Sequence, residues 1–210
     1  MEQRKKRVYR KRIPYGMMNF EDVRKDDCYY VDKTRYIEEV ELSNKYFFYI
    51  RPRRFGKSLT LSMLQNYYDV NKKEQFEQLF GDLYIGKHPT PEHNSYLVMR
   101  LDFSVVAAGI DDYKDGLDEA CNIKYNFFCE VYQQYLPSYV KEEMNKREGC
   151  VNQLQYICDE CYKVGRQIYL FIDEYDHFTN KILAEPQYMT NYRKQTHGEG
   201  YLRLFFDVVK

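Results

Sequence analysis

The sequence predicts an α/β fold, arranged as a three-layer sandwich on a mostly parallel sheet. Apolar runs at 46–50, 97–103 and 168–172 indicate strands, and residues with helical spacing lie between and after them. Strands that alternate with helices are typical of βαβ units, because a parallel neighbour is reached through a crossover helix. The three runs therefore define the predicted sheet.

The composition is that of a folded protein with balanced charge. The 210 residues include 32 basic and 32 acidic side chains, and 44% are hydrophobic. This length supports a substantial core. Neutrality argues against a general nucleic-acid coat, and no apolar run reaches the roughly 18 residues that span a bilayer. The six cysteines are expected to be reduced thiols in a cytoplasm, because no secretory signal follows the basic N-terminus.

We expect two parts in the chain, a basic disordered arm over residues 1–12 and one domain over residues 13–210. The arm contains the run RKKRVYRKR. Such an arm either contacts nucleic-acid phosphates or stays a solvated tail, and the sequence leaves both alternatives open.

The first half of the domain begins with turns and a short helix. A helix is expected near 34–42, and the run KYFFYI then predicts a strand buried on both faces. Leu61, Leu64 and Tyr68 recur at spacings of three and four, so a helix starts at the Gly-Lys-Ser turn. A polar helix over 72–80 leads into a proline-rich loop.

The second half repeats the alternation of strand and helix. The strand at 97–103 is followed by a long helical region over 113–164, interrupted near Pro137 and Gly149. The strand at 168–172 ends in acids. The last segment reads as an amphipathic helix, with one apolar face formed by Tyr201, Leu204, Phe205 and Val208.

The stretch RPRRFGKSL, from 51 to 59, has the context of a phosphate-binding (Walker A) loop. Backbone N–H groups at a strand-to-helix turn point at phosphate oxygens, and the helix dipole adds positive potential. Gly56 lets the backbone approach, Lys57 reaches the β- and γ-phosphates, and the Ser58 hydroxyl ligates Mg²⁺. The candidate nucleotide-binding residues are Arg51, Pro52, Arg53, Arg54, Phe55, Gly56, Lys57, Ser58 and Leu59.

This loop departs from the usual pattern at its first position. Arg51 stands where a glycine is common, and Pro52 fixes one backbone angle of the turn. Arg53 and Arg54 are candidates for further phosphate or partner contacts. The alternative is a chance Gly-Lys-Ser in a basic surface turn.

The run IYLFIDEYD supplies acids at the end of a buried strand (Walker B). A strand in the middle of a sheet places Asp173 at the carboxyl edge, where ligands bind in open α/β sheets. Asp173 is the candidate Mg²⁺ ligand, through water, and Glu174 is the candidate group that polarises the attacking water. The alternative is an ordinary solvated strand end.

Four stretches together resemble the bacterial AAA-ATPase-like family. They are IPYGMMNFEDVRKDDCYYVDKT, IRPRRFGKSLTLSML, LDFS and FIDEYDHFTNKIL, and the resemblance covers residues 13–210. It implies a P-loop NTPase-like fold in which the RPRRF form of the loop is usual. It also implies nucleotide or metal roles for Lys57, Ser58, Asp173 and Glu174.

The resemblance leaves two further expectations. Asp32, Lys33 and Thr34 belong to a family motif whose role the sequence does not reveal. P-loop ATPases of this kind usually have the sheet order 5-1-4-3-2, and the segments that would supply strands 4 and 5, or the nuclease-like domain of longer members, are not found before Lys210. We therefore expect an incomplete sheet and poor stability of the isolated chain.

Weaker signals accompany these motifs. Cys158 and Cys161 have the CxxC spacing, but no second pair completes a zinc site, so free thiols are favoured. His177 is expected to be a polar loop residue. Asp102 and Ser104 either line the nucleotide edge or cap the next turn.

The sequence thus predicts a module that binds ATP and Mg²⁺ and, in the complete family fold, hydrolyses ATP. One alternative is a nucleotide-binding or interaction fragment without turnover, and another is a nucleic-acid-associated protein. A protein partner or an oligomer stays open, and no membrane association is expected.

Overall fold

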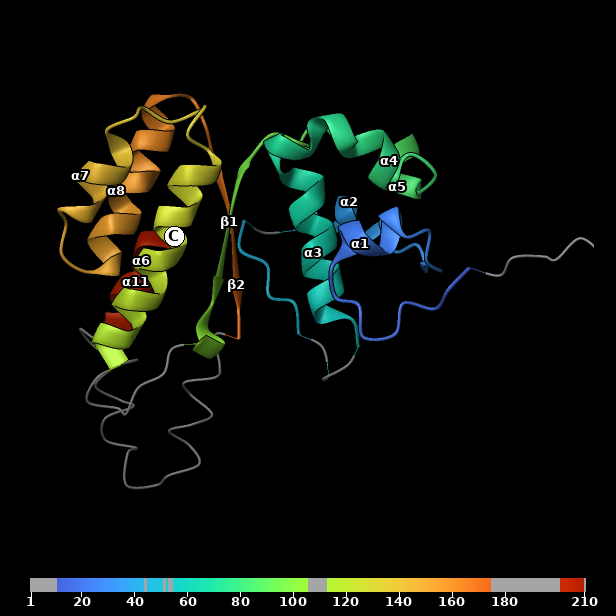
Figure 1. Cartoon of the computed structure of the whole chain (residues 1–210), viewed down its shortest axis with the longest axis horizontal. Coiled ribbons are helices and arrows are strands. Elements are labelled where there is room, and N and C mark those ends of the chain that lie inside the picture. Colours follow the sequence, from blue (N-terminus) through green and yellow to red (C-terminus); the bar gives the residue numbers. More distant parts are fainter. Residues whose placement is uncertain are drawn as a thin grey trace, which may run out of the picture. The chain divides into compact units, whose positions relative to one another are not determined.

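We describe a computed structural model of the chain, shown in Figure 1. The residues that it describes are 11–43, 45–50, 52, 55–105, 113–174 and 201–209. The chain divides into two compact units, residues 1–95 and residues 96–210, and each is described by itself.

The elements described in the N-terminal unit are helices. Its helices are α1 (Phe20–Lys25), α2 (Tyr36–Glu41), α3 (Lys57–Tyr68), η1 (Val70–Gln75), α4 (Phe76–Phe80) and α5 (Tyr84–Lys87). The helices predicted near 34–42 and after the Gly-Lys-Ser turn are confirmed as α2 and α3. The polar helix predicted over 72–80 is split into the 3-10 helix η1 and the α-helix α4.

Aromatic packing anchors α3 within this unit. Tyr67 and Tyr68, in the last turn of α3, are fully buried. The ring of Phe80 lies 5.0 Å from that of Phe20 and 5.5 Å from that of Tyr67, between ring centroids. Such aromatic pairs add roughly 0.5–1.5 kcal/mol beyond the burial of their area. The carboxyl half of α3 is thereby fixed against α1 and α4.

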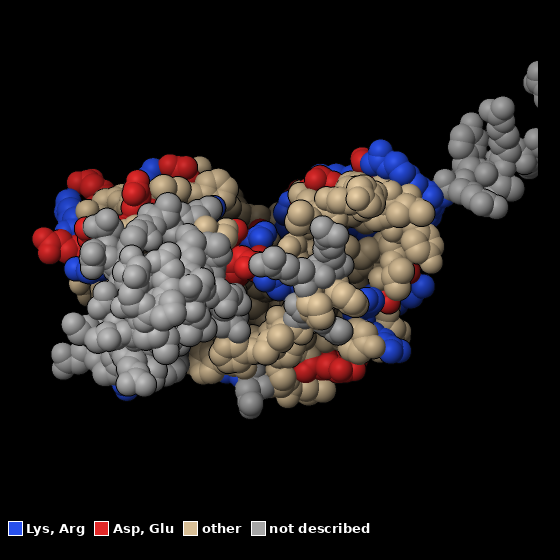
Figure 2. All heavy atoms as spheres, turned by 90° about the horizontal axis from the view of Figure 1, so that it is seen from below, with Lys and Arg blue, Asp and Glu red and all other residues tan. Residues whose placement is uncertain are grey.

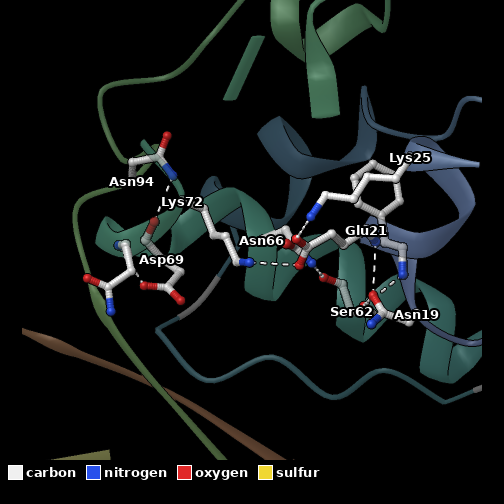
Figure 3. Close-up of polar contacts among 10 residues, drawn as sticks. Asn19, Glu21, Lys25, Ser62, Asn66, Asp69, Lys72 and Asn94 are labelled. Atoms are coloured by element: carbon white, nitrogen blue, oxygen red, sulfur yellow. Dashed lines mark hydrogen bonds and ion pairs between the residues drawn. The ribbon is translucent and has the colours of Figure 1, made fainter. Parts of the chain in front are cut away.

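Polar contacts fix the approach of α1 to α3 (Figure 3). The Phe20 N–H donates to Ser62 Oγ of α3 over 2.9 Å in buried surroundings. The Glu21 carboxylate accepts from Lys25 and, over 2.7 Å, from Lys72 of η1. Hydrogen bonds from both lysines lower the pKa of Glu21 against the opposing effect of partial burial.

The C-terminal unit contains the described strands. Its elements are β1 (Leu97–Asp102), η2 (Phe103–Val105), α6 (Tyr113–Val131), α7 (Val140–Asn145), α8 (Cys150–Lys163), β2 (Ile168–Asp173) and α11 (Tyr201–Val209). Figure 1 shows α6, α7, α8 and α11 grouped on one side of β1 and β2. The predicted helical region over 113–164, with its two interruptions, is confirmed.

The two strands pair in parallel, as predicted. The register runs from Leu97 opposite Ile168 to Asp102 opposite Asp173. Alternate residues of β1 are buried, and Leu97, Met99 and Leu101 form its fully buried face. Residues of opposite parity project from the other face, as the period of two in a strand requires. The α/β class is confirmed, and the finer three-layer arrangement stays a prediction.

The prediction of a strand at 46–50 is wrong. These residues have no strand assignment, and Phe48 and Ile50 are 70% and 79% exposed. An apolar run indicates a tendency to be buried, but it does not specify which surface provides the cover. In the described part of the chain, the sheet therefore has two strands where the sequence predicted three.

The helix α11 is fastened to two other helices of its unit. The Tyr201 hydroxyl donates to the Asp118 carboxylate of α6. The same carboxylate oxygen accepts the N–H of Cys150, the first residue of α8, over 2.7 Å. The left-handed φ of +78° at Gly149 favours glycine, and a Cβ there would lie 2.6 Å from the Tyr201 hydroxyl oxygen, which would have to shift.

The apolar face of α11 also differs from the prediction. Leu202 and Phe205 are the buried residues, whereas Leu204 is 45% exposed. The Phe205 ring packs at 5.6 Å from the ring of Phe103, between centroids. The helix is therefore turned so that its buried stripe runs through Leu202 rather than Leu204.

Candidate functional site

A tight turn precedes α3. The N–H of Phe55 donates to the Pro52 carbonyl over 3.3 Å, which folds the chain back before the helix. Gly56 is the N-cap residue of α3 and has φ +78°, a left-handed conformation that favours glycine. A Cβ built at Gly56 meets nothing within 4 Å, so the space beside its backbone is open. The other candidate residues of the loop, Arg51, Arg53 and Arg54, lie outside the described residues.

The first turn of α3 carries a cation and no acid. It begins with Lys57 and Ser58, followed by Leu59, all three half-buried, and no acidic residue stands in it. The Tyr49 hydroxyl lies 3.4 Å from Thr60 Oγ1, which joins the preceding segment to this turn. A helix start favours negative charge, because its first N–H groups lack intrahelical partners and the dipole is positive there. A lysine with a glycine N-cap fits a phosphate group at this position.

Carboxylates gather at the carboxyl ends of β1 and β2. Asp102 and Asp173 are direct partners in the parallel register, and Glu174 follows Asp173. Asp173 is only 5% exposed, whereas Asp102 and Glu174 are half-buried. Carboxylate oxygens are the donors that Mg²⁺ prefers, so the chemistry of this edge fits a magnesium ion. Among the described residues, no group of three or more His, Cys, Asp or Glu forms a complete metal site.

Arg100 lies on the same face of β1 as Asp102. Its Nη2 donates to Asp173 Oδ2 over 3.0 Å, and the two side chains are 38% and 6% exposed. Burial alone would raise the pKa of Asp102, but hydrogen bonds from Ser104 and the charge of Arg100 outweigh it and lower this pKa. One guanidinium therefore provides positive charge beside both carboxylates.

Glu174 has an unusual backbone conformation. Its φ is +52°, and its N–H donates to Asp173 Oδ1 over 3.0 Å. A residue other than glycine in this region costs roughly 1–2 kcal/mol, and such strain is found often at functional sites. The predicted catalytic glutamate thus stands at a strained turn directly after the strand.

With both halves of the predicted site described, comparison with known proteins identifies the family. The model of the AAA-ATPase-like family, described as "Predicted AAA-ATPase", matches residues 14–210. This chain belongs to the AAA-ATPase-like family. The resemblance drawn from the sequence motifs is confirmed.

One curated relative of this AAA-ATPase-like chain is a bacterial protein. It is an "Uncharacterized protein in vnfD 5'region" of Azotobacter chroococcum mcd 1, with 42% identity over 64 residues. That stretch is 30% of this chain and 12% of the relative, so the chain spans about an eighth of the relative's length. No solved structure matches the chain.

The structure assigns a role to the VDKT motif of this AAA-ATPase-like chain, which the sequence alone did not explain. Asp32 accepts from both the N–H and the hydroxyl of Thr34, over 2.8 and 2.7 Å, and from the Tyr84 N–H over 2.8 Å. The fully buried Thr34 hydroxyl oxygen accepts the Ile85 N–H over 3.2 Å. These oxygens satisfy the first two N–H groups of α5, so Asp32 and Thr34 hold that helix in place. Lys33 is exposed and takes no part in these hydrogen bonds.

The structure also bears on the weaker signals in the sequence of this AAA-ATPase-like chain. All six cysteines are free thiols. Burial raises the pKa of Cys158 to about 11 and of Cys161 to about 12, so both stay protonated and are poor metal ligands or nucleophiles. Asp102 caps the next turn by accepting the Ser104 N–H over 2.9 Å. His177 lies outside the described residues.

The basic arm is described only at its end. Lys11 pairs with Asp27 over 2.6 Å, and Arg12 pairs with Asp26 over 2.7 Å. On the face drawn in Figure 2, acidic and basic side chains of the described residues are interspersed. Nucleic-acid binding through residues 1–12 stays a prediction. In the part of the chain that the structure covers, no helix is both long and apolar enough to cross a bilayer.

The predicted site residues thus fall into two groups. The structure brings Gly56, Lys57 and Ser58 together at the start of α3, in the N-terminal unit. It brings Asp173 and Glu174 together, with Asp102, at the end of the parallel strands in the C-terminal unit. The action of both groups on one nucleotide stays a prediction.

Sequence reasoning missed Arg100. The signal was present, because Arg100 and Asp102 are two residues apart in a predicted strand and must share one face. What the sequence could not show is the register that places Asp173 opposite Asp102, since pairing between strands about 70 residues apart leaves no local pattern.

Proposed function

We propose that this chain binds ATP with Mg²⁺ and is built for hydrolysis of the terminal phosphoanhydride. Three things support the proposal: the family match, the cationic start of α3 and the carboxylates at the end of β2. The observation that carries it is the start of α3, where a left-handed Gly56 with open space beside it precedes Lys57 in a turn without acids.

In this proposal the turn before α3 holds the phosphates. The backbone N–H groups of Lys57 and Ser58 and the ammonium of Lys57 neutralise phosphate oxygens. Pro52 and Phe55 shape the turn through their backbone hydrogen bond, and Leu59 keeps α3 continuous behind it. The proposal also takes Arg51, Arg53 and Arg54, which lie outside the described residues, as sources of further positive charge for the triphosphate. Positioning and charge neutralisation are the main sources of rate enhancement in phosphoryl transfer.

The acidic group supplies the remaining roles. Ser58 and Asp173 would hold Mg²⁺, Asp173 through a water molecule, and the ion would neutralise charge on the phosphate oxygens. Glu174 would orient the attacking water and accept its proton. The hydrogen bond from the Glu174 N–H to Asp173 couples the placement of the two carboxylates.

ATP binding is tested on the full chain with the Lys57→Ala variant. We expect ATP with Mg²⁺ to raise the unfolding midpoint of the wild type, because a ligand that binds only the folded state stabilises it. This shift should be lost in Lys57→Ala. Lys73→Ala is the matched control, since it removes an exposed lysine of η1 in the same unit. Equal shifts in the wild type and Lys57→Ala would contradict the proposed phosphate site.

Hydrolysis is tested with Glu174→Gln. We expect phosphate release to fall by roughly two to four orders of magnitude, the usual contribution of a positioned general base, while ATP binding is kept. Glu119→Gln, at an exposed position of α6, is the control. Unchanged phosphate release in Glu174→Gln would remove this residue from the catalytic role.

The second candidate is nucleotide binding without turnover. The ion pair between Arg100 and Asp173 favours it, because the carboxylate proposed for Mg²⁺ already has a cationic partner. In that case ATP protects the wild type against unfolding, while phosphate release stays at the background rate of the Glu174→Gln variant.

A further inference from the structure

We infer that Arg100 is the resident counter-ion of the carboxylates Asp102 and Asp173 and that it competes with Mg²⁺ for them. The inference rests on the proposed function, because it takes Asp173 as the carboxylate that faces the metal. It assigns to Arg100 a positioning role, in which the guanidinium sets the affinity of the site for a divalent cation.

The register creates the need for a counter-ion. Asp102 and Asp173 are direct partners on neighbouring parallel strands. Such strands lie roughly 4.8 Å apart, and like charges directly opposite one another destabilise a sheet. Asp173 is also withdrawn from water, with a side chain that is 6% exposed. A buried carboxylate without a partner is costly, so this pair requires a nearby cation.

Arg100 meets that need from the same face of the sheet. It precedes Asp102 by two residues and donates from Nη2 to Asp173 Oδ2 over 3.0 Å. Arg100 and Asp102 stand on the same face of β1, so the guanidinium also lies near the Asp102 carboxylate. One guanidinium thus lies beside both carboxylates.

The geometry makes this counter-ion exchangeable. The Arg100 side chain is 38% exposed, far more than its partner, so the guanidinium can move toward water on its flexible stem. Mg²⁺ requires carboxylate oxygens directly or through water, and a guanidinium on Asp173 Oδ2 occupies one of them and repels the ion. Metal binding therefore requires Arg100 to give up this oxygen.

The test is the response of the full chain to Mg²⁺ alone, measured as the unfolding midpoint against MgCl₂ concentration at constant ionic strength. We expect Arg100→Gln to be less stable than the wild type without metal. We expect its half-maximal Mg²⁺ concentration to be lower by about tenfold, because a cation beside a carboxylate changes its affinity for a proton by roughly one to three logarithmic units and a bound metal ion experiences the same charge. The double variant Arg100→Gln/Asp173→Asn should respond to Mg²⁺ no more than the wild type.

Two controls keep the outcome specific to this ion pair. Arg203→Gln removes the arginine of an exposed pair with Asp207 in the same unit, at 3.8 Å, and should leave the Mg²⁺ response unchanged. Arg100→Lys keeps the charge and should stay close to the wild type. If Arg100→Gln does not fold without metal, recovery of the fold on addition of MgCl₂ supports the inference, and failure to recover overturns it.

The failures of the two proposals are distinguishable. Equal Mg²⁺ responses in the wild type and Arg100→Gln, or no response in either, overturn the inference about Arg100 whatever ATP does. A stronger Mg²⁺ response in Arg100→Gln together with no ATP-dependent shift in any variant supports the role of Arg100 and contradicts the proposed nucleotide site.

Discussion

Two helix starts in the N-terminal unit are built in opposite ways. The N-cap side chain of α1, Asn19, accepts the Glu21 N–H over 2.9 Å, and Glu21 and Asp22 stand in its first turn. The start of α3 has a glycine N-cap, a lysine at its first position and no acid in its first turn. In the first design, the chain's own side chains accept an N–H at the helix start and place negative charge near the positive end of its dipole. In the second, the N-cap makes no side-chain hydrogen bond, and we propose that an anion satisfies that end of the helix.

The difference separates structural positions from binding positions. The start of α5 follows the first design, with Asp32 and Thr34 supplying the acceptors. A helix start that has its own acceptors has no need of a ligand, and a substitution there should reduce stability. At the start of α3 a substitution should change ligand binding with little loss of stability. Four experiments test this division.

The largest effect is expected at α5, from Thr34→Val. The change keeps the shape of a fully buried side chain but removes the acceptor of the Ile85 N–H. Leaving a buried donor unpaired costs roughly 1–3 kcal/mol, so the free energy of unfolding in urea should fall by about 2 kcal/mol. Thr34→Ser keeps the hydroxyl and should recover most of the loss. A wild-type free energy of unfolding in Thr34→Val would show that the motif has another role.

A smaller effect is expected from Asn19→Ala. Loss of an N-cap acceptor lowers stability by about 1 kcal/mol, and the affinity for ATP should not change. Asn19→Asp retains an acceptor for the Glu21 N–H and serves as the matched control. Weaker ATP binding in Asn19→Ala at temperatures where the variant is folded would break the comparison between α1 and α3.

Ser58→Asp gives α3 the acid that it lacks. An acid in the first turn of a helix stabilises it by roughly 0.3–1 kcal/mol, so the unfolding midpoint without ligand should rise. ATP binding should be abolished, because the carboxylate repels the phosphates. Ser58→Asn, which adds no charge, is the control for the change in size. A variant that is stabilised and still binds ATP would place the phosphate elsewhere.

The smallest effect is expected in the pH dependence of α1. Hydrogen bonds from Lys25 and Lys72 lower the pKa of Glu21 below its ordinary value of 4.5. A lowered pKa means that the folded state favours the ionised form, so this contribution to stability is present above pH 4.5 and is lost as the pH falls through the lower folded value. Glu21→Gln should therefore show a shallower loss of unfolding midpoint on acidification. An equal loss of unfolding midpoint on acidification in the wild type and in Glu21→Gln would contradict a stabilising role of these ion pairs.

The sequence predicted the elements with strong local patterns. The start of α3 followed from Gly56-Lys57-Ser58 and the helical spacing after it, and β1 and β2 followed from apolar runs bounded by acids. The family was also identified from these motifs and was confirmed by the match over residues 14–210.

The features that the sequence missed depend on contacts between distant residues. The segment 46–50 has the composition of a buried strand, yet Phe48 and Ile50 are exposed, because composition does not supply a covering surface. The face of α11 was assigned to Leu204 rather than Leu202, since a helix with apolar residues on several sides can bury more than one stripe. The pairing of Asp102 with Asp173, and the place of Arg100 beside them, required the register of the sheet.

The hydrogen bond between Tyr201 and Asp118 joins residues that are 83 positions apart, and the same aspartate steadies the first turn of α8. While the ribosome makes the protein, α6 and α8 emerge long before Tyr201 of α11 has been synthesised and can contact Asp118. Loops of that span close slowly compared with local helices, because chain entropy opposes the encounter. The helical layer of the C-terminal unit can therefore mature only after translation has passed Tyr201, because until then Asp118 lacks the hydrogen bond from the Tyr201 hydroxyl.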